Sequence, residues 1–248
     1  MKTLEERVRE LAAGADSVFL NPATVTKLKE QGIDLPEPRR LSAEESVNVL
    51  FSDQRKAHAL QMLKQLPERP DLPVSSIQSL YLEIRAAIVL GLYGAAITLS
   101  GILVEYSLKY AAYKIEMGGF AKYDPDKWDE FERMALAAAI TRADKNQLLT
   151  EEAKDLLHDF RQRFRNPYNH YNIRKITSNY YQENSTSLDT KENEVEIRDV
   201  AAKDNPILQA AAKPLADADN VILVYTYADS VVRYLWDRIK DLPTLRTN

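Results

Sequence analysis

Residues 76–117 read SIQSLYLEIRAAIVLGLYGAAITLSGILVEYSLKYAAYKIEM and decide the fold. Apolar side chains recur at helical spacing on both sides of residues 91–94, where two glycines disfavour a continuous helix. We therefore expect one helix over 76–90, a tight turn, and a second helix over 95–117 that stops at Gly118. Two long apolar helices joined by so short a turn must lie antiparallel. The small residues that permit their close approach are Gly94, Ala95, Ala96, Ser100 and Gly101.

Part of this stretch, Ala86–Val104, carries no charge and is long enough to span a membrane. It also contains glycines and hydroxyl side chains, and Arg85 and Glu105 flank it closely. We expect two buried helices at the centre of a bundle and no membrane association.

The composition favours an all-α protein. The 248 residues are 45% hydrophobic and 28% charged, and only 7 are glycine, which is few for a chain with many tight turns. The absence of cysteine excludes disulfides, thiolate metal sites and a cysteine nucleophile, and it suits a reducing cytoplasm. The N-terminus has no apolar core typical of a signal peptide, so we expect a cytoplasmic protein. The net charge of −4 argues against a general nucleic-acid coat, so any nucleic-acid contact requires a local basic patch.

Upstream of the central pair, the sequence predicts an N-terminal helical extension over residues 1–70. It includes short helical and proline-broken segments up to residue 40. A capping-box pattern at Ser42 then opens a helix that runs to about Leu66. Its apolar stripe is Val47, Leu50, Phe51, Ala57, Leu60 and Leu63. Prolines at 67, 70 and 73 indicate a linker, and the main bundle is expected over residues 75–245.

Downstream, two capped helices are expected. Asp124 caps one that extends through Ile140, and Thr150 caps another with Leu156, Leu157 and Phe160 inward. The second should end near Arg165 or Asn166, because a proline disfavours helical geometry in the residue before it. Residues 179–205 are polar and acidic and indicate a mobile loop with a short strand at 195–200. A last helix over 219–242 closes the bundle.

The stretch after Thr150 ends in a basic segment, 161–175, which reads RQRFRNPYNHYNIRK and holds one of only three histidines. Arginine offers a fixed fork of donors suited to phosphate, and histidine exchanges a proton near neutral pH. Arg165 and His170 are therefore candidate catalytic residues for metal-independent RNA cleavage. The candidate supporting residues are Asn166 and Asn169 as hydrogen-bonding groups and Tyr168 and Tyr171 as stacking groups. The candidate RNA-binding residues are Arg161, Arg163, Arg174 and Lys175.

A structural interpretation of this segment also stands. An arginine followed at short spacing by a histidine is common by chance in a chain this rich in arginine. Arginines at the end of a helix also complement its dipole. The spacing alone does not establish a site.

The region from Ser76 to Leu242 resembles the HEPN (higher eukaryotes and prokaryotes nucleotide-binding) family of helical bundles. The resemblance rests on residues 93–109, YGAAITLSGILVEYSLK, which are similar to an apolar helix with an embedded acid, and on residues 146–161, NQLLTEEAKDLLHDFR, which lead into the motif. The motif is Arg165-Asn166 followed, after three residues, by His170. Arg163 also fits the loose spacing, but Phe164 rather than a polar residue follows it.

The resemblance implies an all-α, HEPN-like bundle that acts as a metal-independent endoribonuclease and leaves a 2′,3′-cyclic phosphate. A single histidine cannot easily serve as both acid and base, so a homodimer would suit the chemistry. The resemblance further implies a defence role and an antitoxin or regulatory partner. One toxin branch carries a tyrosine two residues beyond the histidine, whereas here Tyr171 follows directly and Asn172 takes the later place. The alternative is a non-catalytic module that binds nucleotide, RNA or a protein partner.

Glu105 lies within the apolar helix, on the face shared by Ile102, Leu108 and Ala112, and should be at least partly buried. A buried carboxylate needs a partner. Three possibilities stay open: an ion pair that orients Arg165 or the loop around His170, a pairing with Arg85 or a tyrosine, or simple exposure at the edge of the helix.

No other site is expected. His58 and His158 should be surface residues without ligand-spaced neighbours. Asp124, Asp126 and Asp129 suggest a calcium loop, but they lack its central glycine and are better suited to capping. Because phosphate-binding glycine loops and dinucleotide fingerprints are missing from the sequence, we expect neither cofactor nor metal.

Overall fold

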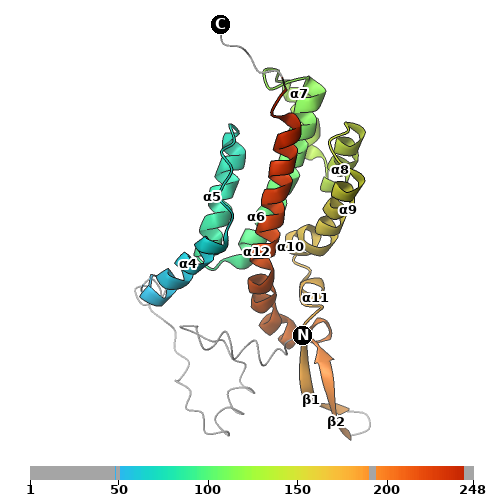
Figure 1. Ribbon diagram of the computed structural model, residues 1–248. Helices are drawn as coiled ribbons and strands as arrows, with labels where there is room; N and C mark the ends of the chain where they lie inside the picture. Colours follow the sequence, from blue (N-terminus) through green and yellow to red (C-terminus); the bar gives the residue numbers. More distant parts are fainter. Residues whose placement is uncertain (1–47, 49–50, 190–193, 243–248) are drawn as a thin grey trace.

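The helices of this protein run mostly along one long axis, as its computed structural model shows (Figure 1). The structure describes residue 48, residues 51–189 and residues 194–242. The expected all-α bundle is confirmed for them, with one two-stranded hairpin added. The longer helices are α4 (Asp53–Gln65), α5 (Ser75–Val89), α6 (Tyr93–Met117), α7 (Pro125–Arg133), α8 (Leu136–Lys145), α9 (Glu151–Phe160) and α12 (Pro206–Ile239). The segments predicted before residue 48 lie outside the described residues.

Helix α6 is the centre of the bundle, packing against α12, α5, α8 and α7. The predicted pair 76–90 and 95–117 is confirmed as α5 and α6, which are joined through Gly91 in the left-handed region (φ +73°). Gly118, also left-handed (φ +70°), ends α6. No described helix is long and apolar enough to cross a membrane.

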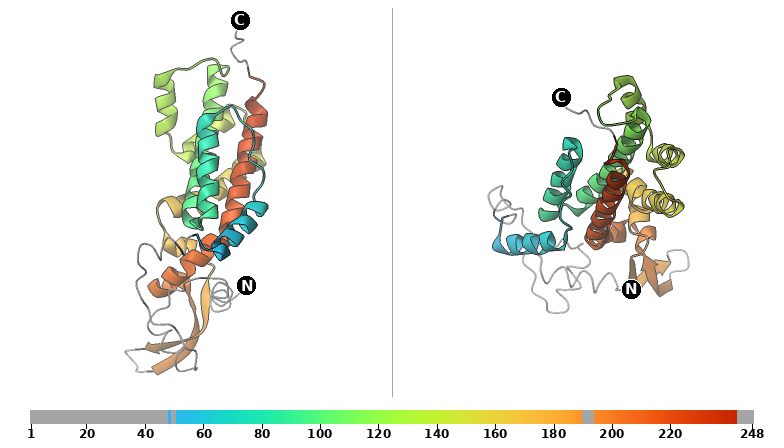
Figure 2. Two further views of the ribbon diagram at one scale, coloured as in Figure 1. Left: turned by 90° about the vertical axis from the view of Figure 1, so that its left-hand side faces the viewer. Right: turned by 45° about the horizontal axis from the view of Figure 1, so that its top comes forward.

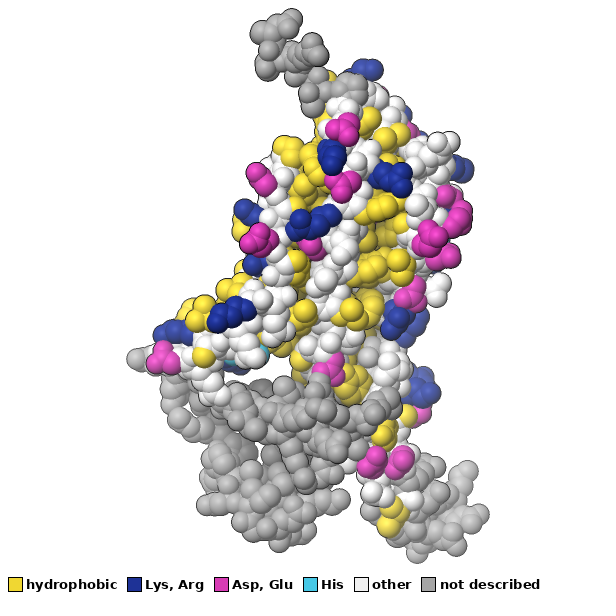
Figure 3. Space-filling model, in the orientation of Figure 1, with side chains coloured by type: hydrophobic (Ala, Val, Ile, Leu, Met, Phe, Trp, Pro, Cys, Tyr) yellow, Lys and Arg dark blue, Asp and Glu magenta, His cyan; other side chains and the backbone are white. Residues whose placement is uncertain are grey.

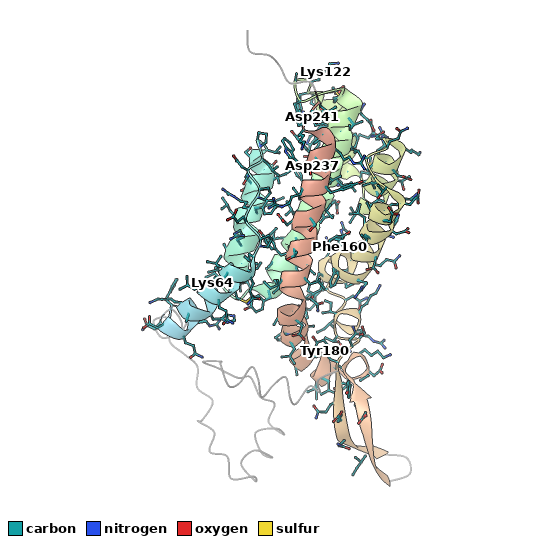
Figure 4. The ribbon with its side chains drawn as sticks, viewed as in Figure 1. Lys64, Lys122, Phe160, Tyr180, Asp237 and Asp241 are labelled. Carbon is teal, nitrogen blue, oxygen red and sulfur yellow. The ribbon has the colours of Figure 1, made fainter. Side chains whose placement is uncertain are left out.

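The apolar face of α12 packs along α6, with α5 on one side and α8 and α9 on the other (Figures 1 and 2). The rings of Phe160, labelled in Figure 4, and Tyr227 stack 4.8 Å apart and join α9 to α12. Hydrophobic side chains remain visible along the seams beside α12 (Figure 3).

The start predicted for the last helix, Asp219, was wrong, because α12 begins thirteen positions earlier, at Pro206. Asn205 caps the helix by accepting hydrogen bonds from the backbone N–H groups of Ile207 and Leu208. Pro206 fits the first turn, where no N–H is needed. The alanine-rich residues that follow are good helix formers, and the exposed Pro214 does not end the helix.

The single helix predicted from Asp124 to Ile140 was also wrong. Asp124 does cap α7, but the chain leaves helical geometry at Met134 and Ala135 and restarts as α8. Lys109 of α6 donates to the carbonyl of Glu132, so a side chain satisfies one of the free carbonyls at the end of α7. In the other predicted helix, Leu157 and Phe160 are buried as expected, whereas Leu156 is exposed.

Residues 179–205 contain a hairpin where a mobile loop was predicted. Strand β1 (Tyr181–Asp189) pairs antiparallel with β2 (Glu194–Ala201), and β2 contains the expected strand at 195–200. The hairpin projects from the end of the bundle where α12 begins (Figure 1). It stands apart from the core, so a polar sequence is compatible with paired strands.

Helix α4 lies across the lower part of the bundle (Figure 2). Ser52 caps it, so the helix predicted to run unbroken from Ser42 was wrong. Of its expected apolar stripe, Phe51 and Leu60 are exposed, whereas Leu63 packs against the core beside the buried Met62 and Leu66. Val47 and Leu50 lie outside the described residues. Met62 and Leu66 belong to the same core as α5 and α6, so the proline linker does not separate two cores among the described residues.

Candidate functional site

The segment that carries the candidate residues stays helical through its proline. A π-helical turn, η1 (Arg161–Arg165), leads directly into the short α10 (Asn166–Asn169). The helix was predicted to end at Arg165 or Asn166, and this was wrong. The N–H of Asn166 donates to the carbonyl of Arg161, five residues back, so the wider turn accommodates Pro167 within a continuous helical path.

Tyr168 holds α10 against the core. Its side chain is only 7% exposed, and its hydroxyl donates to Asp217 Oδ1 of α12 (2.8 Å). Lys213 Nζ lies 2.5 Å from the other oxygen of Asp217 and 5.0 Å from the centre of the Tyr168 ring. A base cannot stack on a buried ring, so the stacking role predicted for Tyr168 is corrected to a structural one.

Burial raises the pKa of the Tyr168 hydroxyl well above its usual value, and the adjacent carboxylate of Asp217 raises it further. The hydroxyl therefore stays protonated and keeps donating to Asp217. This contact fixes one side of α10.

Two glycines of α6 make room for this arrangement. A Cβ at Gly94 would lie 2.7 Å from Asp217 Oδ2, and one at Gly101 would lie 3.3 Å from Cγ of Arg165. These glycines were expected to serve the packing of α5 on α6. They instead allow α12 and the end of η1 to approach α6.

Arg165 is the most tightly held of the candidate residues. Its Nε and Nη2 donate to Glu105 Oε2 at 3.1 and 2.8 Å, and its Nη1 donates to Asn166 Oδ1 at 3.2 Å. Glu105 Oε1 lies 2.8 Å from Lys109 Nζ, four residues along α6. Of the partners left open for Glu105, the ion pair with Arg165 is the one found.

This pairing orients the guanidinium of Arg165 but does not use all of its N–H donors. A guanidinium has five N–H donors, and three are used by Glu105 and Asn166. Two donors are left in the described part of the chain. An arginine held by a carboxylate on one side and free on another is suited to bind an anion such as phosphate.

His170 lies at the far end of α10, where its backbone N–H donates to the carbonyl of Asn166 (3.1 Å). Its side chain is exposed, and its imidazole makes no hydrogen bond within residues 51–189 and 194–242. Tyr171 adopts a left-handed backbone (φ +47°) that turns the chain away directly after His170. The Tyr171 ring is 68% exposed, so it remains accessible to a base.

The other predicted basic residues surround this segment, and they differ in whether their charged groups are already paired. Arg163 pairs with Asp159, and Arg174 donates to the carbonyl of Lys203 and lies 3.4 Å from Asp204. Lys175 is exposed, and Arg161 is partly buried, with no partner for its Nε among the described residues. Dark-blue side chains are visible over this part of the surface, below the acidic edge along α9 (Figure 3).

A pocket of about 330 Å³ lies beside Arg165. Helix α6 contributes Ile102, Glu105, Tyr106 and Lys109 to its lining. The remaining lining residues are Trp128 and Glu132 of α7, with Arg165 and Asn169. Sequence reasoning identified Glu105, Arg165 and Asn169 but missed the others. The spacing of Glu105 and Lys109 by four residues was an available signal, because such pairs meet on one helix face.

His58 and Asp124 lie as expected, whereas His158, predicted to be a surface residue, is half-buried. His58 is exposed on α4, although it bonds to the Tyr93 hydroxyl (2.6 Å), and Asp124 is an N-cap. No cluster of three or more His, Asp or Glu side chains that could hold a metal occurs in the parts of the chain that the structure describes.

Comparison of the sequence with protein-family models and with curated proteins found no match, and comparison of the structure with solved structures found none either.

Proposed function

We propose that this chain is a HEPN-type, metal-independent endoribonuclease in which Arg165 binds the scissile phosphate and His170 transfers a proton. The observation that carries the proposal is the geometry of one short helix. Arg165, held by Glu105 with two N–H donors unused among the described residues, directly precedes α10, and the exposed His170 directly follows it.

The proposed reaction needs no cofactor. A base removes the proton of the ribose 2′-hydroxyl, and O2′ then forms a bond to phosphorus while the bond from phosphorus to O5′ breaks. An acid protonates the leaving O5′, and the products are a 2′,3′-cyclic phosphate and a free 5′-hydroxyl. Arg165 would stabilise the negative charge that accumulates on the phosphoryl oxygens.

One histidine supplies only one of the two proton transfers. We propose that a second copy of the chain brings its own His170 to the same phosphate, so that the enzyme is a homodimer. Activity per chain should then fall on dilution, over the same concentrations at which sedimentation shows the dimer dissociating.

The test uses variants that should preserve the fold. Single-stranded RNA is incubated in EDTA with wild type, His170→Ala and Arg165→Lys. We expect His170→Ala to reduce cleavage at least about 100-fold, because general acid–base groups contribute about 10²–10⁴-fold to rates. Arg165→Lys should reduce cleavage about tenfold or more, since it keeps the charge but loses the fork that Glu105 orients.

Matched controls are available in the chain. His158→Ala removes a histidine from α9, and Arg238→Ala removes an exposed arginine near the end of α12 that belongs to none of the candidate residues. Both should retain nearly full activity. Equal activity in all variants, or none in wild type, would overturn the assignment.

A non-catalytic RNA- or nucleotide-binding module is the second candidate. What favours it is the imidazole of His170, which lacks an orienting partner in the described part of the chain. This candidate predicts that wild type retards RNA in a gel without cleaving it, and that Arg165→Lys weakens the retardation.

From the resemblance alone, we propose a cytoplasmic defence or stress-response role in which an antitoxin or regulatory partner controls the activity. Co-purification of the chain from its native cells would identify such a partner.

A further inference from the structure

The pocket beside Arg165 suits an uncharged group better than a phosphate. Its two cations, Lys109 and Arg165, both pair with Glu105, and Glu132 adds a second carboxylate. Two positive and two negative charges therefore line the pocket, and they balance. A phosphate placed inside would compete with Glu105 for both cations and would face the carboxylate of Glu132.

The walls of the pocket are aromatic. The rings of Tyr106 and Trp128 lie 5.8 Å apart in an edge-on arrangement, and both line the pocket. Their polar atoms are already engaged, because the Tyr106 hydroxyl accepts from Ser76 Oγ (2.8 Å) and Trp128 Nε1 donates to Glu132 Oε1 (2.8 Å). These side chains therefore offer apolar ring surface, against which a flat heterocycle stacks.

The size of the pocket and the residues at its rim limit the kind of molecule that it can bind. Its volume of about 330 Å³ is at the lower end of the range for small-molecule sites. The exposed side chains of Glu132 and Asn169 stand at its edge. Trp128 uses one oxygen of Glu132, and the other has no partner among the described residues. A carboxylate only accepts hydrogen bonds, so it favours a base that carries an amino group.

We propose that this pocket binds a nucleobase next to the phosphate held by Arg165, and that it prefers the amino-bearing bases adenine, cytosine and guanine to uracil. The proposal rests on the proposed function, since it assumes that an RNA phosphate lies at Arg165. Arg165 and Asn169 both line the pocket, so a base seated there lies next to the arginine proposed to bind the phosphate.

The probes are AMP, CMP, GMP and UMP, and the signal is the fluorescence of Trp128 in a Trp236→Phe background, which leaves one tryptophan. We expect saturable quenching by the first three nucleotides and affinity for UMP that is lower by about tenfold, a difference of about 1.4 kcal/mol. Glu132→Gln keeps an acceptor for Trp128 but removes the carboxylate. It should reduce this preference severalfold.

A blocking variant tests the location. Ile102, which lines the pocket and is 40% exposed, is replaced in Ile102→Phe, and nucleotide affinity should fall at least about tenfold, since the larger side chain fills the space. The control is Leu82→Phe, the same kind of change at a 57% exposed position of α5 outside the pocket. It should bind like the parent.

RNA cleavage measured in parallel separates the two proposals. If nucleotides quench the fluorescence and Ile102→Phe abolishes the quenching, the proposed nucleobase site is supported. This holds even if no variant cleaves RNA and the nuclease assignment fails. Absence of quenching, or quenching unchanged in Ile102→Phe, overturns the pocket. Cleavage that persists in Ile102→Phe with the same base preference also overturns the pocket and leaves the nuclease assignment standing.

Discussion

At the scale of single residues, the candidate site depends on side chains that hold others in place. Glu105 orients Arg165 from one side, and Tyr168 anchors α10 from another through Asp217. Asp217 is itself buried and paired with Lys213, so its charge is compensated inside the core. The proposed reactive groups are thus attached to the core through polar contacts as well as apolar packing.

Tyr168→Phe tests this anchor. Removing the hydroxyl leaves Asp217 Oδ1 without its donor, and we expect the free energy of unfolding in urea to fall by about 1–3 kcal/mol. Tyr171→Phe, which alters an exposed ring three residues away, should leave the stability unchanged. Equal stability of both variants and wild type would show that the hydroxyl contact contributes nothing.

At the scale of elements, α7 and α8 are attached to α6 through one acidic side chain. Glu116 accepts hydrogen bonds from Arg142 and Asn146 and lies 3.1 Å from Lys127 Nζ. The hydrogen bonds from Arg142, and then those from Asn146 and Lys127, outweigh burial and lower the pKa of Glu116 to about 2. The break at Met134 is compatible with a stable fold because this cluster holds both short helices to α6.

The lowered pKa of Glu116 predicts a dependence of stability on pH. The folded state binds a proton at Glu116 less readily than the unfolded state, so the contribution of Glu116 is complete above about pH 5 and is lost as the pH falls toward 2. Glu116→Gln should therefore lower the free energy of unfolding by about 2 kcal/mol at pH 7, with a difference from wild type that shrinks at pH 3.

The control is Asp53→Asn, which removes the exposed partner of Lys56 on α4 and should not alter stability measurably. A difference between wild type and Glu116→Gln that stays constant from pH 7 to pH 3 would contradict the assigned role of Glu116.

At the scale of the whole molecule, a buried carboxylate of α12 joins distant parts of the chain. Asp229 accepts from the Tyr81 hydroxyl of α5 (2.8 Å) and from Arg233 Nε (2.8 Å). Arg233 also donates to the carbonyl of Glu68, and Arg85 donates to that of Pro67, so the proline linker is attached to the same network. Burial and the adjacent Asp229 raise the pKa of Tyr81, which keeps its hydroxyl a donor.

Asp229→Asn is expected to destabilise the bundle by about 2–4 kcal/mol, because it removes the charge that compensates Arg233 and leaves one amide in place of two acceptors. The matched control is Asp237→Asn, on the same helix and labelled in Figure 4, where an exposed carboxylate pairs with Lys240. Thermal unfolding of the two variants should differ clearly, and equal melting temperatures would contradict the structural role of Asp229.

Much of the fold could be predicted because it depends on local signals. The glycines between and after the two apolar runs indicated the ends of α5 and α6, and the caps Asp124 and Thr150 identified the starts of α7 and α9. The errors occurred where long-range packing decided the outcome. Lys109 and the cluster around Glu116 stabilise the break at Met134, and a π-turn carries the helix through Pro167.

The features of the candidate site also fall into those that the sequence could identify and those that depend on long-range packing. Arg165, His170 and the acid at Glu105 could be identified from residue type and spacing. The sequence could not identify the partner of Glu105 or the tyrosine that is buried. It also could not show that a pocket lies beside Arg165.

The sequence by itself determined the helical class and the central pair α5 and α6, because these follow from local periodicity, glycine and capping. It also predicted the candidate pair Arg165 and His170 from residue type and spacing. Only the tertiary structure decided that Glu105 pairs with Arg165, that Tyr168 is anchored to Asp217, and that Trp128 lines the pocket. The reason is physical: these contacts join residues tens of positions apart, and helix packing brings them together.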